Sequence, residues 1–220
     1  MLEIQNEDKV AFLAQFPVSY ETAKLLEQYA FLLCDWNEKF NLVATSTLDT
    51  LWRRHFMDSA QLLRFIPEKA ANIADLGSGA GFPGLVLSIL GARGVVLIES
   101  TGKKADFLRK VIEDLGLTAR VLQERIENIT EPKFDVITAR ALKPLPELLK
   151  LAQRLTKKET ICLFLKGQKL DAELTESSQW WRFTHQRHVS LSDPSGNVLI
   201  IRDLQYKNAA PRKPHKRNRA

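Results

Sequence analysis

Apolar and polar positions alternate with two different spacings along this chain, and the spacing changes near residue 67. Before that point apolar side chains recur every three or four residues, which is the spacing of an amphipathic helix. Helices are therefore predicted over 6–16, 20–39 and about 48–64, with Ser19 as the N-cap of the second. Pro67 closes this helical part.

After residue 67, short apolar runs alternate with helical stretches. Strands are predicted at 72–76, 94–99, 118–123, 134–139 and 160–165, and helices at 83–91, 102–115 and 145–155. Strands that alternate with helices in this way form a parallel sheet with helices on both faces. The chain then becomes extended around a strong turn signal at 193–197, which predicts a terminal antiparallel hairpin.

The sequence divides into a helical extension at 1–67, an α/β domain at 68–206 and a basic tail at 207–220. The net charge is +6, and six cations beginning at Lys207 account for all of it, because the other 26 basic residues balance 26 acidic ones. Such a tail, here with Pro211 and Pro214, is typical of a disordered arm that binds nucleic acid. A solvated tail without a partner is the alternative.

The composition is that of a folded protein with a hydrophobic core, and it does not suggest a membrane protein. Hydrophobic residues make up 45% of the chain, which is enough for a proper core, and no apolar run is long enough to span a membrane. The first ten residues do not resemble a signal sequence, and Cys34 and Cys162 lie in apolar stretches that favour free thiols. His185 and His188 are spaced to point to opposite faces of a strand, so no metal site is expected. We expect a cytoplasmic monomer.

The most informative stretch is the glycine-rich turn at 75–84, between the first predicted strand and the next helix. Gly77, Gly79 and Gly81 allow positive φ angles and a close approach of a ligand to the backbone. The start of the helix offers N–H groups to a negatively charged group. The dinucleotide-binding fingerprint also fits the glycines formally, but counted from the end of the strand its third glycine would be Phe82.

Glu99 ends the next predicted strand, where an acid can bind both hydroxyls of a ribose. Together with the acid before the turn and the repeated glycines, it resembles the first two motifs of class I S-adenosylmethionine (SAM) methyltransferases. SAM has a ribose but no pyrophosphate, so the bulky Phe82 favours SAM over a nicotinamide dinucleotide. A nicotinamide-dependent enzyme, and a glycine-rich turn in an unrelated α/β protein, stay open as alternatives.

A dense polar segment, Arg53–Ser59, interrupts the third predicted helix. Two arginines, a histidine and an aspartate fall within six positions. This pattern indicates either a polar network or a surface that faces phosphate groups. His55 alone would most often be an interior histidine with satisfied hydrogen bonds.

Five short motifs occur in one order along the chain. They are Asn41-Leu42, Arg54-His55 with Asp58-Ser59, the glycine-rich turn, Thr138-Ala139-Arg140-Ala141 and Lys166-Gly167. Together they resemble the RsmG (GidB) family of bacterial methyltransferases, which make 7-methylguanosine in 16S ribosomal RNA. The resemblance runs from about residue 20 to 204. Glu99-Ser100 stands where that family commonly has Asp-Ser.

The resemblance implies a Rossmann-like class I SAM methyltransferase sheet with an N-terminal helical extension and a C-terminal antiparallel hairpin. It implies SAM as cofactor and 16S ribosomal RNA, free or in a small-subunit assembly, as partner. Ile126 can give the adenine an apolar face, and Glu127 can accept from its amino group. The expected cofactor-binding residues are Gly77, Gly79, Gly81, Phe82, Glu99, Ile126, Glu127 and Arg140, and the expected RNA-contacting residues are Arg54, His55 and Lys166.

Arg140, just after the fourth predicted strand, is the residue to which we assign a part in catalysis. The N7 atom of guanine has a free lone pair and no proton to lose, so alignment matters more than a general base. Arg140 is expected to position the substrate or order the pocket wall. The alternative to an enzyme is a non-catalytic RNA-binding or ribosome-associated protein that uses the basic tail.

Overall fold

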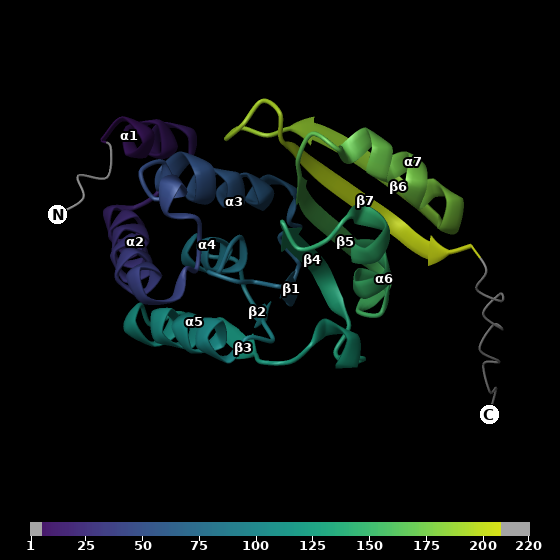
Figure 1. Cartoon of the computed structure of the whole chain (residues 1–220), viewed down its shortest axis with the longest axis horizontal. Coiled ribbons are helices and arrows are strands. Elements are labelled where there is room, and N and C mark those ends of the chain that lie inside the picture. Colours follow the sequence, from purple (N-terminus) through teal and green to yellow (C-terminus); the bar gives the residue numbers. More distant parts are fainter. Residues whose placement is uncertain (1–5, 208–220) are drawn as a thin grey trace.

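Residues 6–207, which the structure describes, form a seven-stranded sheet with the order β3-β2-β1-β4-β5-β7-β6 in this computed structural model (Figure 1). Strands β1 to β5 pair in parallel, and β7 joins β5 and β6 in antiparallel pairs. The strands are β1 (Ile73–Leu76), β2 (Val95–Ile98), β3 (Arg120–Leu122), β4 (Phe134–Arg140), β5 (Thr156–Lys166), β6 (Trp181–Val189) and β7 (Asn197–Tyr206). The predicted parallel sheet and terminal hairpin are confirmed.

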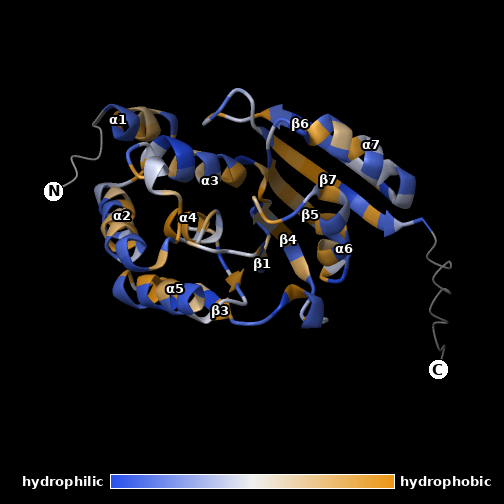
Figure 2. Ribbon diagram, in the orientation of Figure 1, coloured by the Kyte–Doolittle hydropathy of each residue, from blue (hydrophilic) through white to orange (hydrophobic). Residues whose placement is uncertain are grey.

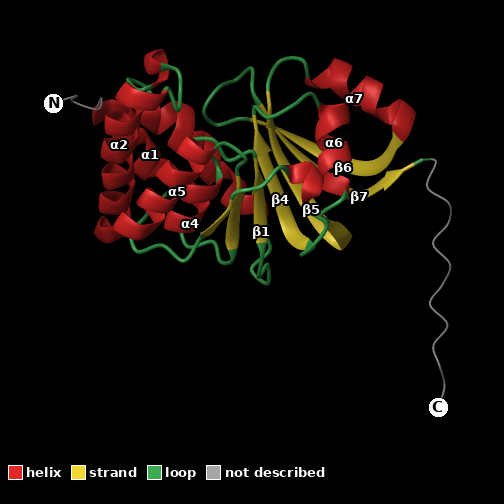
Figure 3. Ribbon diagram, turned by 60° about the horizontal axis from the view of Figure 1, so that its bottom comes forward, coloured by secondary structure: helices red, strands yellow, loops and turns green. Residues whose placement is uncertain are grey.

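Helices cover both faces of this sheet, as Figure 3 shows. One layer holds α1, α2, α3, α4 and α5, and the other holds α6 and α7 (Figures 1 and 3). The helices are α1 (Asn6–Gln15), α2 (Tyr20–Phe40), α3 (Asp58–Ala60), α4 (Gly84–Ile89), α5 (Gly102–Asp114), α6 (Leu145–Gln153) and α7 (Leu170–Trp180). Short turns of other helix types are η1 (Thr45–Thr47), η2 (Trp52–Met57), η3 (Gln61–Phe65) and η4 (Ile126–Asn128).

Two cores form because successive strand residues point to opposite faces of the sheet. Ile73 of β1 packs with α2, α4 and α5, while the next residue, Ala74, packs with α6 and the start of α7. Figure 2 shows the apolar residues concentrated along the central strands and the inward sides of the helices. Residues of α1 and α2 belong to the same core as α4 and α5, so the N-terminal helices are built into the first layer.

The single helix predicted over 48–64 is wrong in detail. Residues Trp52–Met57 form a π-helix, Asp58–Ala60 an α-helical turn and Gln61–Phe65 a 3₁₀-helix. The periodicity was helical, but polar side chains of this segment bind the β6–β7 loop, and Arg53 Nε donates to the Ser192 carbonyl at 3.2 Å. Local π turns often occur where a helix serves a functional site.

Helix α7 is a further element that the apolar pattern did not predict. Leu170 and Ser177 are buried along it, with Leu174 partly buried between them, so its apolar stripe is narrow. Its first turn is fixed by Glu173, which accepts from the Leu145 backbone N–H at 2.9 Å and pairs with Lys166 at 2.6 Å. Such long-range contacts leave no local signal in the sequence.

The prediction for the basic tail lies almost wholly outside the described residues, which end at Lys207. In the part of the chain that the structure describes, none of the helices has the length and apolar character needed to cross a bilayer. Cys34 and Cys162 are both free thiols, but only Cys162 is buried, whereas the sequence predicts buried thiols at both positions.

Candidate functional site

The predicted site residues at strand ends lie along one edge of the sheet. Leu76 pairs with Ile98 on one side and Ala139 on the other, and Arg140 pairs with Leu165. Gly77 and Glu99, which follow β1 and β2, and Lys166, the last residue of β5, therefore share the carboxyl edge with Arg140. This is the edge at which open α/β sheets bind ligands.

The glycine-rich turn has the backbone that the sequence predicts. Gly77, Gly79 and Gly81 have φ angles of 64°, 56° and 97°, which side chains with a Cβ rarely adopt. A Cβ at Gly79 would meet nothing nearer than the Gly77 carbonyl at 3.8 Å, so the space in front of Gly79 is open. A ligand can therefore lie directly against this stretch of backbone.

Glu99 is hydrogen-bonded to the same turn. One carboxylate oxygen accepts from the Gly79 N–H at 2.9 Å, and the other accepts from the Thr101 N–H at 2.8 Å. The side chain is 7% exposed. A carboxylate has about four acceptor sites, so Glu99 keeps acceptor capacity for a further donor such as a hydroxyl group.

Asp75, the acid before the turn, is fully buried and closes the turn from behind. Its carboxylate accepts from the Gly84 N–H at 3.2 Å and from the Thr138 hydroxyl at 2.9 Å. Burial raises the pKa of Asp75 to about 6. Since Asp75 already binds the first N–H of α4, that group is not free for a ligand, contrary to the expectation from the sequence.

Tyr29 of α2 supports the turn from the N-terminal layer, whereas its place in the apolar stripe of α2 predicts only core packing. Its hydroxyl donates to the Ala80 carbonyl, and its ring lies 5.4 Å from the Phe82 ring. Burial raises the pKa of Tyr29 well above its usual value, so the phenol stays protonated as the donor. The spacing that placed Tyr29 on the apolar face of α2 gave no sign of this polar contact.

Phe82 is 3% exposed and lies beneath two polar side chains. The His55 ring stacks on it with the centroids 4.7 Å apart, and the Arg140 guanidinium lies 4.7 Å from its centroid. A cation over an aromatic face is attracted by the ring quadrupole. Phe82 thus forms a hydrophobic base under His55 and Arg140.

Arg140 is held by residues of the polar segment that precedes the α/β domain. Its guanidinium donates to the Arg54 carbonyl at 3.3 Å and to His55 Nδ1 at 2.8 Å, and lies 3.6 Å from the Asp58 carboxylate. Because arginine has only donors, His55 Nδ1 must be the acceptor and Nε2 must carry the proton. Nε2 then donates to the Thr47 hydroxyl at 2.8 Å.

Asp58 links this arrangement to the loop between β6 and β7. One carboxylate oxygen accepts from the Ser192 hydroxyl at 2.8 Å and from the Ser190 hydroxyl at 3.2 Å. Gln61 Nε2 donates to the same oxygen at 3.1 Å. The polar segment is therefore a network, which was one of its two predicted roles, and its partners Ser190 and Ser192 were not predicted from the sequence.

A pocket of about 420 Å³ opens beside this network. Its lining includes Arg54, His55, Arg140 and Lys166, so the structure brings all three predicted RNA-contacting residues together with Arg140. The remaining lining comes mainly from the 43–47 segment, from the β6–β7 loop, which includes Asp193, and from Asn197 at the start of β7. Arg54 and Asp193, which both line the pocket, form an ion pair at 3.0 Å.

Ile126 and Glu127 lie apart from this pocket, in the short turn η4 after β3. Ile126 is 8% exposed and packs in the α6 core, while Glu127 is exposed. Its carboxylate accepts from Arg125 at 3.3 Å. The pKa of Glu127 is lowered, first by its own backbone N–H and then by Arg125. Within residues 6–207, no group of histidine, cysteine and acidic side chains is arranged to hold a metal ion.

His55 gives a prediction about stability and pH. Burial first, and then the charges of Arg140 and Arg54, lower its pKa to about 3. The unfolded chain takes up a proton here near pH 6.5, so stability that is present above pH 6.5 is lost as the pH falls toward 3. As the pH falls from 6 to 5, we expect the free energy of unfolding of the wild type to decrease by about 1 kcal/mol more than that of His55→Gln.

Urea denaturation of both proteins at each pH measures this change. Asp75 titrates in the same range in both proteins, so its contribution cancels in the difference. A difference that stays constant from pH 6 to pH 5 would show that His55 is not held neutral by its surroundings.

The sequence of this chain matches one protein family over most of its length. The family model for GidB, rRNA small subunit methyltransferase G, matches residues 22–200. A protein named ribosomal RNA small subunit methyltransferase G from Rhodospirillum centenum is 48% identical, with 88% of this chain and 89% of that protein covered. The protein of the same name from Gluconobacter oxydans is 46% identical, with 86% and 97% covered.

Solved structures with the same arrangement of elements are more distant. A point mutant of MtNAS in complex with S-adenosylmethionine is 22% identical, with a TM-score of 0.56 over 81% of this chain and 72% of that one. A ribosomal protein L11 methylase from Lactobacillus delbrueckii is 18% identical, with a TM-score of 0.52 over 66% and 76%. At these identities the likeness establishes the fold.

Proposed function

The chain belongs to the rRNA small subunit methyltransferase G family, and we propose that it methylates the N7 atom of a guanine in small-subunit ribosomal RNA, with SAM as the methyl donor. One observation carries this proposal. The open glycine-rich turn lies at the carboxyl edge of the sheet, and the pocket at the same edge is lined by Arg54, Arg140 and Lys166.

The residues of the turn fit SAM. The open face of Gly79 admits a ligand against the backbone, and Glu99 keeps acceptor capacity for ribose hydroxyls at the end of β2. Ile126 and Glu127 would lie at the adenine end, with an apolar surface and an acceptor. Bound there, SAM supplies a methyl group on a positively charged sulfur. Phe82 would support the pocket from below, because its ring is covered by His55 and Arg140.

The pocket fits an RNA base and its phosphates. Arg54 and Lys166 line it, each paired with an acid that phosphate groups would have to compete with: Arg54 with Asp193 and Lys166 with Glu173. Arg140 stands between the pocket and Phe82. Two of the contacts of the Arg140 guanidinium, to Arg54 and His55, are hydrogen bonds that fix its plane. We infer that Arg140 is a positioning residue, which orders the wall against which the guanine is held.

Among the described residues, the histidine and the aspartate beside Arg140 are engaged in hydrogen bonds and serve to position other groups. His55 and Asp58 lie beside Arg140, but both ring nitrogens of His55 are hydrogen-bonded and its pKa is about 3. The Asp58 carboxylate is bound by Arg140, Ser190, Ser192 and Gln61. Guanine N7 needs no deprotonation, so this arrangement suits the reaction.

We therefore expect the single-turnover rate of methylation to stay level between about pH 6.5 and 8.5. His55 titrates far below this range, and Asp75, at about 6, titrates just under it. The measurement is a rate profile with saturating RNA and SAM on enzyme shown to be folded at each pH. A rate that climbs tenfold per pH unit would mean that a group on the enzyme must lose a proton.

Two experiments separate the proposed function from its rivals. Calorimetry with SAM and with NAD should give binding for SAM alone, and the reverse result would favour a nicotinamide enzyme. Transfer of labelled methyl from SAM should occur to 16S ribosomal RNA or small subunits and not to 23S RNA. SAM binding without any transfer, to RNA or to subunits, would favour a non-catalytic RNA-binding protein.

A further inference from the structure

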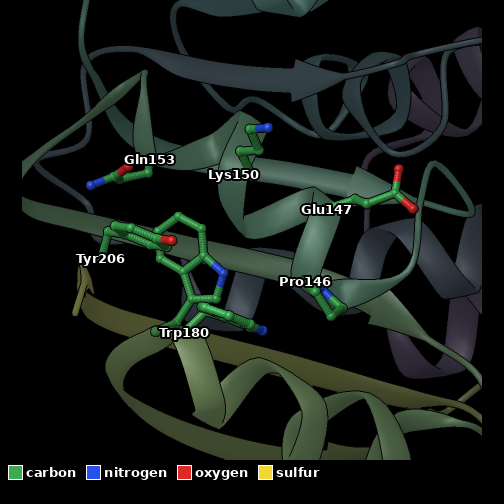
Figure 4. A pocket seen from close by; sticks show the side chains of 7 residues that line it. Pro146, Glu147, Lys150, Gln153, Trp180 and Tyr206 are labelled. Carbon is green, nitrogen blue, oxygen red and sulfur yellow. The ribbon is translucent and has the colours of Figure 1, made fainter. Parts of the chain in front are cut away.

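A second hollow of about 380 Å³ lies on the other helical layer, between α6 and the junction of α7 with β6 (Figure 4). We call it the aromatic groove. It is lined by Pro146, Glu147, Lys150, Gln153, Trp180, Trp181 and Tyr206. Figure 4 shows Lys150 and Gln153 of α6 on one side, with Trp180 and Tyr206 on the other.

Aromatic rings dominate the groove. Trp180, the last residue of α7, is 51% exposed, which is high for such a large apolar side chain. Trp181 begins β6 and is nearly buried, and its ring meets that of Tyr206 edge-on with the centroids 5.1 Å apart. An exposed indole beside a fixed pair of rings offers a flat surface on which another ring can stack.

The charges around the groove favour an anion. Lys150 lines it, and the charge of Glu147 is offset by Lys143 at 3.2 Å. Lys207 lies at the end of the groove, where its backbone N–H donates to the Trp180 carbonyl at 2.9 Å and its ammonium donates to the Ser178 carbonyl. The six cations that give the chain its net charge of +6 begin with this residue.

The groove and the active-site pocket share no lining residue, but Lys143 and α6 lie between them. Lys166 lines the active-site pocket, and its ammonium donates to the Lys143 carbonyl at 3.1 Å. Lys143 is two residues ahead of α6, and the groove follows one side of α6 from Pro146 to Gln153. The aromatic end of the groove lies at the amino edge of the sheet, where Trp181 pairs with Tyr206. A strand whose target base enters the pocket would therefore pass Lys143 and follow α6 over its length before it reaches Trp180.

We propose that the aromatic groove binds an unpaired nucleotide of the substrate RNA, outside the methylation target, with its base stacked on Trp180 and its phosphates near Lys150 and Lys207. This inference rests on the proposed RNA substrate. Stacking on aromatic side chains contributes affinity with little sequence preference, and neighbouring cations hold the backbone. The groove would add affinity and fix the path of the strand without choosing the target base.

The test compares Trp180→Ala with the wild type in binding to a single-stranded fragment of 16S ribosomal RNA and to SAM. We expect RNA affinity to fall about tenfold, which corresponds to about 1.4 kcal/mol, while SAM affinity stays unchanged. Trp180→Phe should keep RNA affinity within about threefold. Phe31→Ala is the matched control, since Phe31 is 59% exposed on α2 in the opposite layer.

A second measurement does not depend on any variant. Ultraviolet cross-linking of wild-type protein to the same RNA carrying 4-thiouridine should mark peptides that contain Trp180 or Tyr206. The proposal is overturned if Trp180→Ala binds RNA as tightly as the wild type and no such peptide is marked. It is also overturned if the variant loses affinity for small subunits but not for naked RNA, because the occupant would then be a ribosomal protein.

These outcomes are distinct from failure of the proposed function. If the wild type neither binds SAM nor methylates RNA, the proposed function fails whatever the groove does. If the wild type methylates RNA and the groove variant is indistinguishable from it, only the groove proposal fails.

Discussion

Replacing Arg140 with alanine is expected to lower the single-turnover rate of methylation about 100-fold, or about 2.7 kcal/mol in activation free energy. The guanidinium is the common partner of the Arg54 carbonyl, His55 and Asp58, and it covers Phe82. Alanine would leave the wall of the pocket without the group that orders it. The half-buried Asp58 would also lose its ion pair, so stability should fall by about 2 kcal/mol.

Arg140→Lys separates positioning from stability. An ammonium can pair with Asp58, but it cannot make the two hydrogen bonds of the planar fork while covering the ring of Phe82. We therefore expect the lysine variant to recover part of the melting temperature and little of the rate. Arg109→Ala, which removes an exposed arginine paired with Asp106 on α5, is the control. Lysine restoring the rate fully would show that only the charge of Arg140 matters.

Replacing Gly79 with valine is expected to weaken SAM binding at least tenfold, or by about 1.4 kcal/mol. The φ angle of 56° is unfavourable for a β-branched residue, and the new side chain would fill the open space in front of the turn. The Gly79 N–H that binds Glu99 would also be displaced. Calorimetry measures the affinity, and far-ultraviolet circular dichroism should change little.

Gly116→Val is a closely matched control. Gly116 follows α5 with a φ angle of 62°, and a Cβ there would also meet open space. Both variants should therefore carry similar backbone strain and lose similar stability, while only Gly79→Val should lose SAM affinity. Equal SAM affinity in the two variants would place the SAM pocket elsewhere.

The sequence predicts those parts of the site whose geometry depends on residues close together in the chain or at the end of a strand. Gly77, Gly79 and Gly81 lie within five residues, and their positive φ angles follow from the lack of a Cβ. Glu99 was predictable because the end of a parallel strand has a known place at the edge of a sheet. Lys166 and Arg140 meet at that edge for the same reason.

The contacts that orient Arg140 could not be predicted, because they join segments far apart in the chain. Asp58 meets Ser190 and Ser192 across more than 130 positions, and Tyr29 reaches Ala80 across 51. The spacing of these serines, and of a tyrosine on an apolar helix face, gives no sign in the sequence that they bind distant polar groups. The π-helical form of 52–57 is equally non-local, since it accompanies contacts made with the β6–β7 loop.

The most direct test of the proposed function identifies the methylated nucleoside. Purified protein is incubated with labelled SAM and small-subunit particles or 16S ribosomal RNA from cells that lack this gene, and the RNA is digested to nucleosides. From the proposed function we expect that the label appears as 7-methylguanosine at a single position and is lost with Arg140→Ala. Label in another nucleoside, or the same yield of 7-methylguanosine from Arg140→Ala, would contradict it.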